Sequence, residues 1–349
     1  MMTVGYEVTS LAENRYGGIA TVCRHTLKQA VNRPSIEPTA LYRRGSADNF
    51  DEIGIQIRKI SWRDHFRLSR YDVLHALCHR IPPVRHRRLV YTLHDAWSLY
   101  PNQYQSPDFQ RKIGKRIIVE LRRADAVVCD SRATLERLDR LQIVDPARCQ
   151  VVYPGVDPTA EWSSGLRSTE LSQLLSAKFV LFVGRIEVRK NLEHVIDAII
   201  PLSDLHLVVV GEWGYGGREI SAGTLSRLPM ERLHRLERVS GAELSLLYSK
   251  ATAALQPSWE EGFGLPMLEA MVHGCPLITS NCSASAEVAG DAAILVDPAE
   301  SAQSTAALQQ LLKDGAARTR WAEAGRVRSQ AFTWSAYFEG LLNLYTNLG

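Results

Sequence analysis

One stretch, Pro257-Ser-Trp-Glu-Glu-Gly-Phe-Gly-Leu-Pro-Met-Leu-Glu-Ala-Met271, carries the clearest structural signal in the sequence. The apolar run before it, 252–255, has the length of a buried strand, and a helical pattern covers 266–273. Between them lies a loop with two glycines, and Pro266 stands where proline suits a helix start. Strand, glycine loop and helix in this order predict a βα unit whose helix N-terminus favours an anion.

Strand and helix patterns alternate along the rest of the chain. The other predicted strands are Val4–Thr9, Thr39–Tyr42, Asp72–Ala76, Leu89–Leu93, Ala126–Cys129, Gln150–Tyr153, Phe179–Gly184, Leu205–Gly211, Leu277–Thr279 and Ala293–Val296. The other predicted helices are Gly18–Val31, Lys112–Arg123, Ser131–Leu141, Leu192–Ile200, Glu243–Ala251 and Ser304–Leu312. Alternation of this kind predicts parallel sheets covered by helices on both faces.

The alternation pauses once, at Tyr153-Pro-Gly-Val-Asp-Pro158, and the polar stretch Ser163–Thr169 follows. Two prolines around a glycine are typical of a hinge between domains. A chain of 349 residues also suggests two domains, at roughly 150 residues for each. We therefore expect an α/β fold with two doubly wound Rossmann-like domains, 1–157 and 158–333, facing each other across a cleft.

Composition excludes several classes of protein. With 45% hydrophobic and 23% charged residues, the chain has an ordinary globular composition. No apolar run approaches the ~20 residues of a membrane helix, and Met1–Leu11 lacks the pattern of a secretory signal. We therefore expect a cytoplasmic protein. We also expect reduced thiols and no metal site, because the cysteines are scattered at Cys23, Cys78, Cys129, Cys149, Cys275 and Cys282.

Charge is distributed unevenly. Residues 1–150 hold 25 Lys+Arg against 16 Asp+Glu, and residues 151–349 hold 16 against 22, which together give the totals of 41 and 38. A basic first half indicates an anionic partner such as a phosphate group or a phospholipid surface. Nucleic acid is not expected, because the basic residues have no interleaved aromatics and match no nucleic-acid-binding motif.

Two carboxylates bracket the glycine loop, Glu261 before it and Glu269 in the expected first turn of the helix. A carboxylate does not bind phosphate, so each is expected to accept hydrogen bonds from sugar hydroxyls while a phosphate lies on the loop. The alternative for Glu269 is a purely structural one, because a Glu in a first helical turn commonly completes the helix cap.

The segment Phe179-Val-Leu-Phe-Val-Gly-Arg-Ile-Glu-Val-Arg-Lys-Asn-Leu192 predicts a buried strand followed by a cationic loop. Arg185 and Lys190 stand at the carboxyl end of this strand, where they could neutralise a diphosphate. The alternative is a solvated loop with weak ion pairs to Glu187 or Glu193.

The first half has two further candidates. Paired glycines at Gly17 and Gly18, within Arg15-Tyr-Gly-Gly-Ile-Ala20, would let a helix start approach a ligand closely. His94 and Asp95 follow a predicted strand, and a His–Asp pair there would suit acid–base or binding chemistry.

Taken together, these segments closely resemble retaining nucleotide-sugar glycosyltransferases of family four, which have the GT-B fold, and among them a mannosyltransferase-like group. The resemblance rests on Val183–Asn191, Pro257–Met271 with its Glu-x7-Glu motif, Glu287–Ala292, the interdomain link Tyr153–Asp157 and the final-helix segment Phe332–Tyr337. It implies that a C-terminal helix at about 334–349 crosses back to the first domain, which binds the acceptor, while the second domain binds the nucleotide sugar.

The resemblance also implies roles for single residues. In this family Glu261 would lie near the transferred sugar, Glu269 on the ribose, Arg185 and Lys190 on the diphosphate, and His94 on the donor sugar. The remaining donor contacts would come from Gly17 and Gly18, from the backbone of Gly264 and Leu265, and from the backbone near Val239.

The implied reaction is the transfer of a hexose with retention of configuration, without a metal or any cofactor besides the nucleotide-sugar donor. The loop Gly262–Pro266 favours a GDP-mannose-type donor, with a UDP-hexose as the alternative. The setting would be bacterial polysaccharide or lipopolysaccharide assembly.

The acceptor is expected to be a glycan or a lipid-linked glycan. The basic segments Arg111–Arg123 and Arg85–Arg88 could lie on the inner face of the cell membrane, and the alternatives are a solvated basic face and a soluble acceptor. Rival functions are a nucleotide-sugar epimerase, a non-catalytic binding protein and an NAD-dependent oxidoreductase. The glycines after Leu205–Gly211 do not have the dinucleotide-binding spacing that an oxidoreductase requires.

Overall fold

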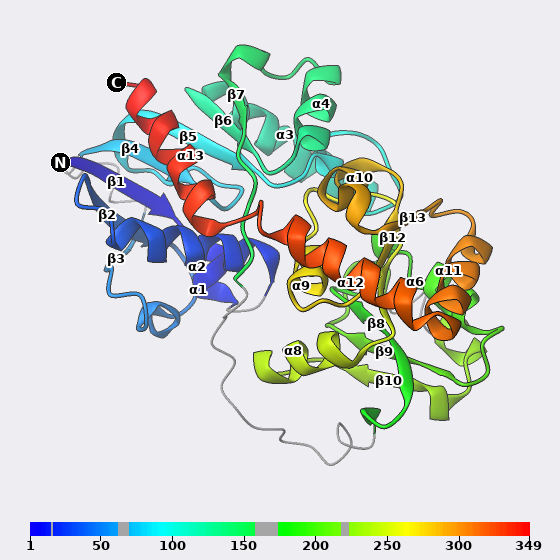
Figure 1. The fold of residues 1–349 in the computed structure, drawn as a ribbon. Coiled ribbons are helices and arrows are strands. Elements are labelled where there is room, and N and C mark those ends of the chain that lie inside the picture. The colour runs from blue at the N-terminus through cyan, green and yellow to red at the C-terminus, as the bar shows by residue number, and fades with distance from the viewer. Residues whose placement is uncertain (15–16, 62–69, 158–173, 218–222) are drawn as a thin grey trace. The chain divides into compact units, whose positions relative to one another are not determined.

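The computed structural model describes residues 1–14, 17–61, 70–157, 174–217 and 223–349. These residues form two compact units (Figure 1). Unit 1 comprises Met1–Pro101, Pro107–Gly155 and Thr333–Gly349, and unit 2 comprises Asn102–Ser106 and Val156–Phe332. Each unit contains one parallel sheet, as the alternation of strand and helix patterns predicted.

The sheet of unit 1 has seven strands in the order β3-β2-β1-β4-β5-β6-β7, and every neighbouring pair is parallel. The strands are β1 (Met2–Glu7), β2 (Ile36–Tyr42), β3 (Gln56–Lys59), β4 (Arg70–Ala76), β5 (Arg85–Leu93), β6 (Ala126–Cys129) and β7 (Cys149–Val151). The sequence patterns missed only β3 in this sheet, because an edge strand with the sequence Gln-Ile-Arg-Lys has no apolar run.

The helices of unit 1 pack against this sheet. They are α1 (Thr9–Glu13), α2 (Gly18–Val31), α3 (Pro107–Arg123), α4 (Arg132–Arg140) and α13 (Trp334–Asn347), with 3-10 turns at Ala47–Phe50, Trp97–Leu99 and Pro146–Arg148. Helix α3 buries Ile117 and Leu121 in the core with Tyr91 of β5. Ser131 caps α4 by accepting a hydrogen bond from the Thr134 backbone N–H at 3.1 Å, so α4 begins where the sequence predicted.

Strand β5 begins at Arg85, earlier than the apolar run Leu89–Leu93 suggested. The basic cluster Arg85–Arg88 therefore forms the first half of a strand paired with β4. Arg88 forms a hydrogen bond within this unit, in which its Nε donates to the Leu348 carbonyl oxygen at 2.7 Å.

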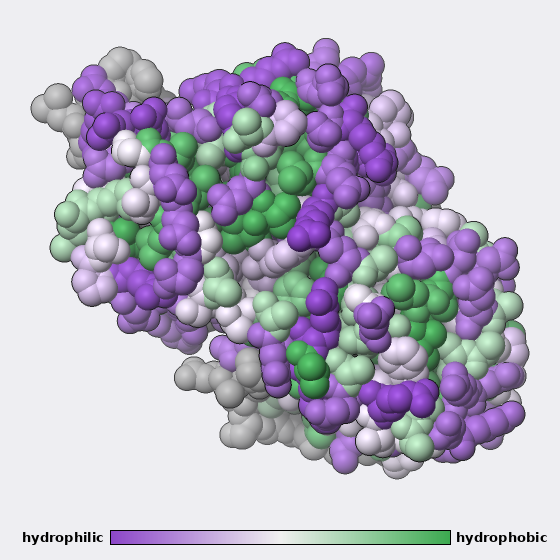
Figure 2. Space-filling view, turned by 45° about the horizontal axis from the view of Figure 1, so that its top comes forward, coloured by the Kyte–Doolittle hydropathy of each residue, from purple (hydrophilic) through white to green (hydrophobic). Residues whose placement is uncertain are grey.

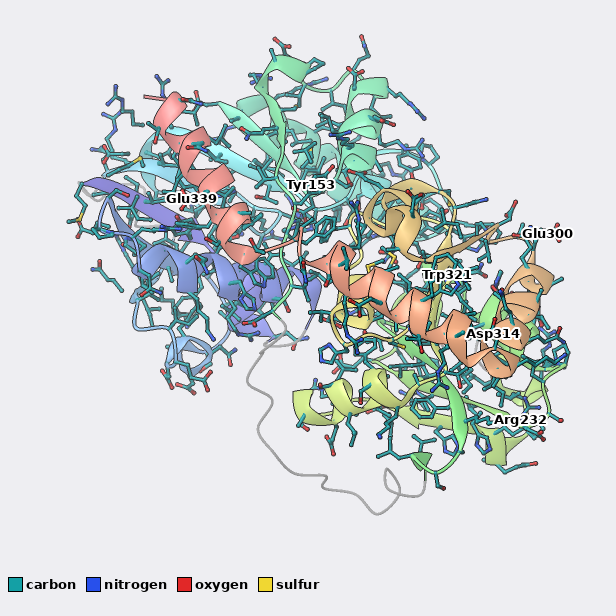
Figure 3. All side chains as sticks on the ribbon, viewed as in Figure 1. Tyr153, Arg232, Glu300, Asp314, Trp321 and Glu339 are labelled. Carbon is teal, nitrogen blue, oxygen red and sulfur yellow. The ribbon has the colours of Figure 1, made fainter. Side chains whose placement is uncertain are left out.

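The C-terminal helix α13 belongs to unit 1, and the expectation that it returns to the first domain is confirmed. Trp334 at its start stacks on His25 of α2, with ring centroids 4.3 Å apart. Near its end, the Tyr345 hydroxyl and the His75 Nδ1 lie 2.6 Å apart. Glu339, labelled in Figure 3, forms an ion pair with Arg33 just beyond α2.

The sheet of unit 2 has six parallel strands in the order β10-β9-β8-β11-β12-β13. They are β8 (Lys178–Val183), β9 (Leu205–Val210), β10 (Leu233–Leu236), β11 (Ala253–Gln256), β12 (Leu277–Ser280) and β13 (Ile294–Val296). The core strand β8 is apolar on both faces, and each residue from Phe179 to Phe182 is fully buried. The edge strand β10 was not predicted, because its sequence Leu-His-Arg-Leu is only half apolar.

The helices of unit 2 are α6 (Leu192–Ile199), α8 (Gly241–Lys250), α9 (Leu265–Val272), α10 (Ser283–Ala289), α11 (Ser301–Lys313) and α12 (Gly315–Ser329), with 3-10 turns at Val188–Lys190, Leu225–Arg227, Met230–Arg232 and Gly290–Ala292. Helices α10 and α12 were not predicted. Small residues dominate α10, and α12 leaves apolar Val327 exposed, so neither shows a clear apolar face in the sequence.

Hydrophilic residues cover most of the surface seen in Figure 2, with smaller hydrophobic patches between them. Among the described residues, no helix is both long and apolar enough to cross a membrane.

Candidate functional site

The candidate site of unit 2 forms where two neighbouring strands end. Because β8 and β11 pair in parallel, the loops that follow them leave the same edge of the sheet. Asn191, at the end of the first loop, has a left-handed backbone with φ 57°. Its amide nitrogen donates to the carbonyl oxygens of Pro257 at 3.1 Å and Pro298 at 2.8 Å, which fastens the two loops together.

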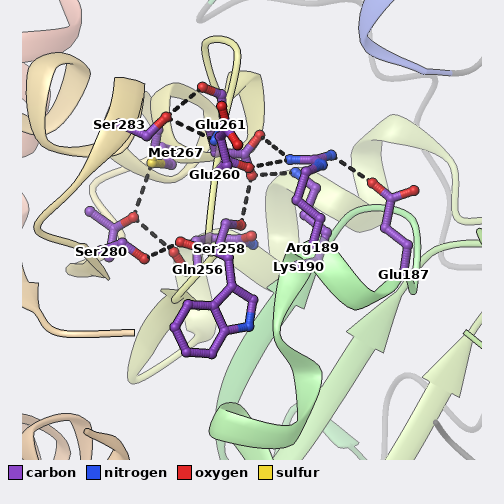
Figure 4. A network of polar contacts seen from close by, with 12 residues as sticks. Glu187, Arg189, Lys190, Gln256, Ser258, Glu260, Glu261, Met267, Ser280 and Ser283 are labelled. Atoms are coloured by element: carbon purple, nitrogen blue, oxygen red, sulfur yellow. Dashed lines mark hydrogen bonds and ion pairs between the residues drawn. The ribbon is translucent and has the colours of Figure 1, made fainter. Parts of the chain in front are cut away.

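Glu261 is the centre of this site (Figure 4). Lys190 Nζ lies 2.5 Å from Glu261 Oε1, and Arg189 Nη1 lies 3.0 Å from Glu261 Oε2. The Ser258 hydroxyl donates to Glu261 Oε1 at 2.7 Å. Burial by itself raises the pKa of Glu261, but Lys190 and Arg189 outweigh burial and lower the pKa to about 2. Glu261 is therefore an ionised, buried carboxylate at neutral pH.

Arg189 is a site residue that the sequence reasoning missed. Its guanidinium bonds Glu261, the Glu260 carbonyl oxygen at 2.6 Å and Glu187 Oε1 at 2.6 Å. The sequence signal for this role was weak. Arg189 stands next to Lys190, but arginines in a loop after a strand are commonly solvated. The alternative of weak ion pairs from Lys190 to Glu187 or Glu193 is wrong, because Lys190 pairs with Glu261.

Arg185, the other predicted cation, is separate from this network. Its side chain is exposed, and within the described parts of the chain no carboxylate lies at ion-pair distance from it. The loop after β8 therefore carries two buried cations, Arg189 and Lys190, and one exposed cation, Arg185.

Gly264 sets the start of α9. It has a left-handed backbone with φ 101°, which strains any residue with a Cβ and therefore favours glycine. No side chain caps the helix and no acidic residue lies in its first turn. A helix start without a side-chain cap favours an anion, and the anion site at Leu265 stays a prediction from the glycine loop.

Helix α9 begins at Leu265, one residue earlier than predicted, so Glu269 lies just beyond the first turn, and both the first-turn placement and the cap explanation are wrong. It is the fifth residue of a helix that begins at Leu265. The Tyr248 hydroxyl, from α8, donates to Glu269 Oε2 at 3.1 Å and fixes the carboxyl group. Burial raises the Glu269 pKa, and the hydrogen bond from Tyr248 offsets part of that rise.

Val239 lies in the short connection between β10 and α8. Ser240, which follows it, caps α8 by accepting from the Glu243 N–H at 3.3 Å, while Glu243 Oε2 accepts from the Ser240 N–H at 2.7 Å. This reciprocal cap holds the connection in one conformation.

In unit 1, His94 follows β5 and its carboxylate partner is Asp130, not the neighbouring Asp95 that the sequence suggested. His94 Nδ1 lies 2.7 Å from Asp130 Oδ2, and Nε2 lies 2.7 Å from the Leu77 carbonyl oxygen. Burial alone lowers the pKa of His94, but Asp130 and the Leu77 carbonyl raise it to about 9. Asp130 was missed because it follows the next strand, β6, and only strand pairing brings the two together.

Gly17 and Gly18 lie at the start of α2. Gly17 has φ 121°, and a Cβ there would meet no atom of the described residues within 4 Å, so those residues leave space at this helix start. The preceding Arg15 and Tyr16 lie outside the described residues.

All six cysteines are free thiols, as expected. No group of three or more His, Cys, Asp or Glu side chains arranged to hold a metal ion occurs in the part of the chain that the structure describes.

Two parallel Rossmann-like sheets are the architecture of the GT-B fold, and comparison with known proteins identifies a glycosyltransferase. The family described as "Glycosyl transferases group 1" matches residues 171–328, and "Glycosyltransferase Family 4" matches residues 5–160. The chain belongs to glycosyltransferase family 4, a family of retaining hexosyltransferases.

Its relatives include the O-antigen chain mannosyltransferase B of Escherichia coli, which is 29% identical over 75% of this chain and 71% of its own length. The D-inositol 3-phosphate glycosyltransferase of Corynebacterium glutamicum is 27% identical over 74% of this chain and 66% of its own length. Among solved structures, Anabaena HepE in complex with UDP-glucose has a TM-score of 0.79 and 17% identity, covering 99% of this chain and all of that one. That similarity concerns the fold.

Replacing Arg189 with Ala tests the Glu261 network. The change leaves a buried carboxylate with one cation instead of two, and we expect a loss of about 3 kcal/mol in the free energy of unfolding at pH 7. Urea denaturation measures it. The control Glu193→Gln removes an exposed charge and should change stability by less than about 0.5 kcal/mol. Equal effects of both substitutions would contradict the buried network.

The same network predicts a pH dependence. Because the folded-state pKa of Glu261 is depressed to about 2, its contribution is complete above the unfolded pKa, about 4.5, and disappears as pH falls towards 2. We expect Glu261→Gln to flatten the decline in unfolding free energy between these pH values. A wild-type and a Gln variant with parallel curves there would refute this account.

His94 predicts the opposite dependence, because its folded-state pKa is raised. Its stabilising contribution is complete below the unfolded pKa of about 6.5 and is lost as pH rises through 9, by about 3 kcal/mol in total. We expect His94→Gln to remove this decline, while His86→Gln, on the same sheet, retains it. Urea denaturation from pH 6 to 9.5 makes the comparison.

Proposed function

We propose that the protein transfers a hexose, with retention of configuration and without a metal, from a nucleoside-diphosphate sugar to a glycan or lipid-linked glycan. A GDP-mannose-type donor is favoured. The observation that carries the proposal is the buried Glu261 carboxylate, held by Lys190 and Arg189 beside the uncapped start of α9, in a chain of this family. Unit 2 would bind the donor and unit 1 the acceptor.

The charged residues predicted for the donor site in unit 2 each have a role in this proposal. Glu261 accepts hydrogen bonds from the hydroxyls of the transferred sugar, and Glu269, oriented by Tyr248, accepts from the ribose. An ammonium group has three donors, so the bond from Lys190 to Glu261 leaves others for the diphosphate. Arg185, exposed after β8, adds a second positive charge there.

The chemical step then depends on electrostatic stabilisation. As the bond to the anomeric carbon breaks, negative charge grows on the leaving nucleoside diphosphate. Lys190, Arg185 and the backbone N–H groups at Gly264 and Leu265 would stabilise this charge. A diphosphate oxygen would take the proton of the acceptor hydroxyl, which attacks from the face that the leaving group departs.

His94 is proposed to act on the donor sugar through its charge. Both of its ring nitrogens already face acceptors, Asp130 and the Leu77 carbonyl, so the imidazolium has no remaining N–H for a ligand. His94 would therefore act on the donor sugar through the positive charge of its ring and through its backbone groups. Gly17 and Gly18 would allow close approach of the donor, and the backbone near Val239 would contact the base.

The relatives support alternatives for both substrates. The mannosyltransferase from Escherichia coli acts in O-antigen synthesis by its name, which favours a mannosyl donor and lipopolysaccharide assembly. HepE was solved with UDP-glucose, which keeps a UDP-hexose as the alternative donor. The Corynebacterium relative is named for inositol 3-phosphate, which supports a soluble acceptor as the alternative.

We further propose that α3 contacts an anionic membrane at the cytoplasmic face. Its exposed basic residues are Arg111, Lys112, Lys115, Arg122 and Arg123. Apolar Val119 is 56% exposed among them and Phe109 is 48% exposed at the helix start. Basic side chains around exposed apolar ones are typical of a helix that lies on a phospholipid surface.

A thermal-shift panel with GDP, UDP, ADP, dTDP and NAD, each with and without EDTA, tests the donor proposal. A nucleotide at about 100 times its Kd should stabilise the protein by about 2.7 kcal/mol and raise its Tm. We expect one nucleoside diphosphate to act, unaffected by EDTA, and Glu269→Ala or Lys190→Ala to abolish the shift. Lys250→Ala, an exposed lysine at the end of α8, is the matched control.

A shift with NAD alone would contradict the proposal and favour an oxidoreductase. A nucleotide response abolished by EDTA would contradict metal independence. Donor turnover without transfer to any glycan would favour the epimerase.

Sedimentation with vesicles tests the membrane contact. We expect the protein to bind phosphatidylglycerol vesicles and not phosphatidylcholine vesicles at low salt. The double variant Arg122→Gln/Arg123→Gln should bind at least tenfold more weakly, at about 1 kcal/mol for each basic residue near the surface. Arg140→Gln, on α4, should bind as the wild type does. Equal binding by the double variant and wild type would refute the contact.

A further inference from the structure

A second group of charged side chains lies at the carboxyl edge of the unit 1 sheet. Glu7 ends β1, Arg43 follows β2 and Arg80 follows β4, and these strands are neighbours in the order β2-β1-β4. Helix α3 adds Arg116 and Glu120. We name these five residues the arginine–carboxyl cluster. Carboxyl edges of parallel sheets are where ligands of such folds bind.

The five side chains are linked by one ion pair and by electrostatic interactions. Arg43 Nη2 lies 3.9 Å from Glu7 Oε1, and Arg43 interacts electrostatically with Glu7, Arg80, Glu120 and Arg116. Glu120 in turn interacts with all three arginines. The charges of the cluster therefore influence one another, and its two carboxyl groups are buried.

The cluster holds several buried polar atoms without a hydrogen-bond partner. They are Glu7 Oε2, Glu120 Oε2 and Arg116 Nε. Glu7 is fully buried and Glu120 is 9% exposed. A buried polar atom without a partner costs about 1–3 kcal/mol, and native proteins contain few of them. Three in one group, at a ligand-binding edge, are unexpected for a purely structural role.

Two neighbours extend this pattern. The Tyr91 hydroxyl and His79 Nδ1 are also buried without a partner. Tyr91 interacts electrostatically with Glu120, Arg116 and Glu7, and His79 interacts with Arg116. The unsatisfied atoms include both donors and acceptors, as a ligand with charged and hydroxyl groups requires.

The charge of the cluster indicates what kind of ligand it binds. The cluster contains three guanidinium groups and two carboxyl groups, and burial lowers the pKa of Arg43 while Glu7 opposes that change. Burial raises the pKa of Glu7 well above its ordinary value, although Thr9 and Arg43 oppose the rise, and burial also raises that of Glu120. The carboxyl groups therefore do not neutralise the arginines fully, and the cluster favours an anion.

We propose that the arginine–carboxyl cluster binds a phosphorylated acceptor, with Arg43, Arg80 and Arg116 on the phosphate and the two carboxyl groups on an adjacent sugar hydroxyl. Guanidinium forks match phosphate oxygens, and carboxyl oxygens match hydroxyls. This inference rests on the proposed glycosyltransferase function. The phosphate can belong to a soluble sugar phosphate or to a lipid-linked diphosphate sugar.

Isothermal titration calorimetry with three probes tests this. The probes are glucose, glucose 1-phosphate and farnesyl diphosphate in detergent micelles, and a saturating nucleoside diphosphate fills the donor site first. We expect a phosphate-bearing probe to bind at least about tenfold more tightly than glucose, since each charge-assisted hydrogen bond contributes that much or more. Arg43→Gln, Arg80→Gln and Arg116→Gln should each raise its Kd about tenfold or more. Arg140→Gln should not change it.

Each outcome has one meaning. Tight binding of glucose 1-phosphate supports a soluble sugar phosphate, and tight binding of farnesyl diphosphate alone supports a lipid-linked acceptor. Phosphate probes that bind no better than glucose, or equally well to the three arginine variants, overturn the inference. Arg80 is exposed, so Arg80→Gln remains informative if the other variants fold poorly. If a nucleoside diphosphate raises the Tm while the phosphate probes fail, only this inference falls. If no nucleoside diphosphate raises the Tm, the proposed function fails instead.

Discussion

The carboxylate of Glu261, held between Lys190 and Arg189, is the interaction on which unit 2 depends. It joins the loop after β8 to the loop after β11, with bonds of 2.5 Å and 3.0 Å. A buried carboxylate is costly by itself, and a single cation seldom compensates for that cost. Here two cations and the Ser258 hydroxyl share it. The loops can therefore hold an ionised group in one place without a ligand.

Parallel strands make this arrangement possible. In each unit, neighbouring strands deliver charged side chains to the same edge, where the strands leave the apolar core. Unit 2 uses this edge for Glu261 and the open start of α9. Unit 1 uses it for the His94–Asp130 pair and for the arginine–carboxyl cluster. The two edges differ, because both oxygens of Glu261 have protein partners, whereas Glu7 and Glu120 each have one oxygen without a partner.

Much of the fold could be predicted, because buried parallel strands are continuous apolar runs. The apolar run at Phe179–Phe182 predicted β8, and the glycine loop predicted the start of α9 to within one residue. The edge strands β3 and β10 were missed for the same physical reason, since an edge strand needs no apolar run. Helix α13 was assigned to the first domain from family resemblance, and the contacts of Trp334 and Tyr345 show what holds it there.

The candidate site divides in a similar way. Residue types and spacing alone marked Lys190, Glu261 and Gly264, because each stands in a loop directly after an apolar strand. The roles of Arg189 and Asp130 emerge only in the folded chain. Arg189 meets Glu261 across 72 residues, and Asp130 meets His94 across 36. Spacing along the sequence indicates local geometry, but it does not determine which strands pair. Pairing in the sheet decides which side chains share an edge, and so which charges meet.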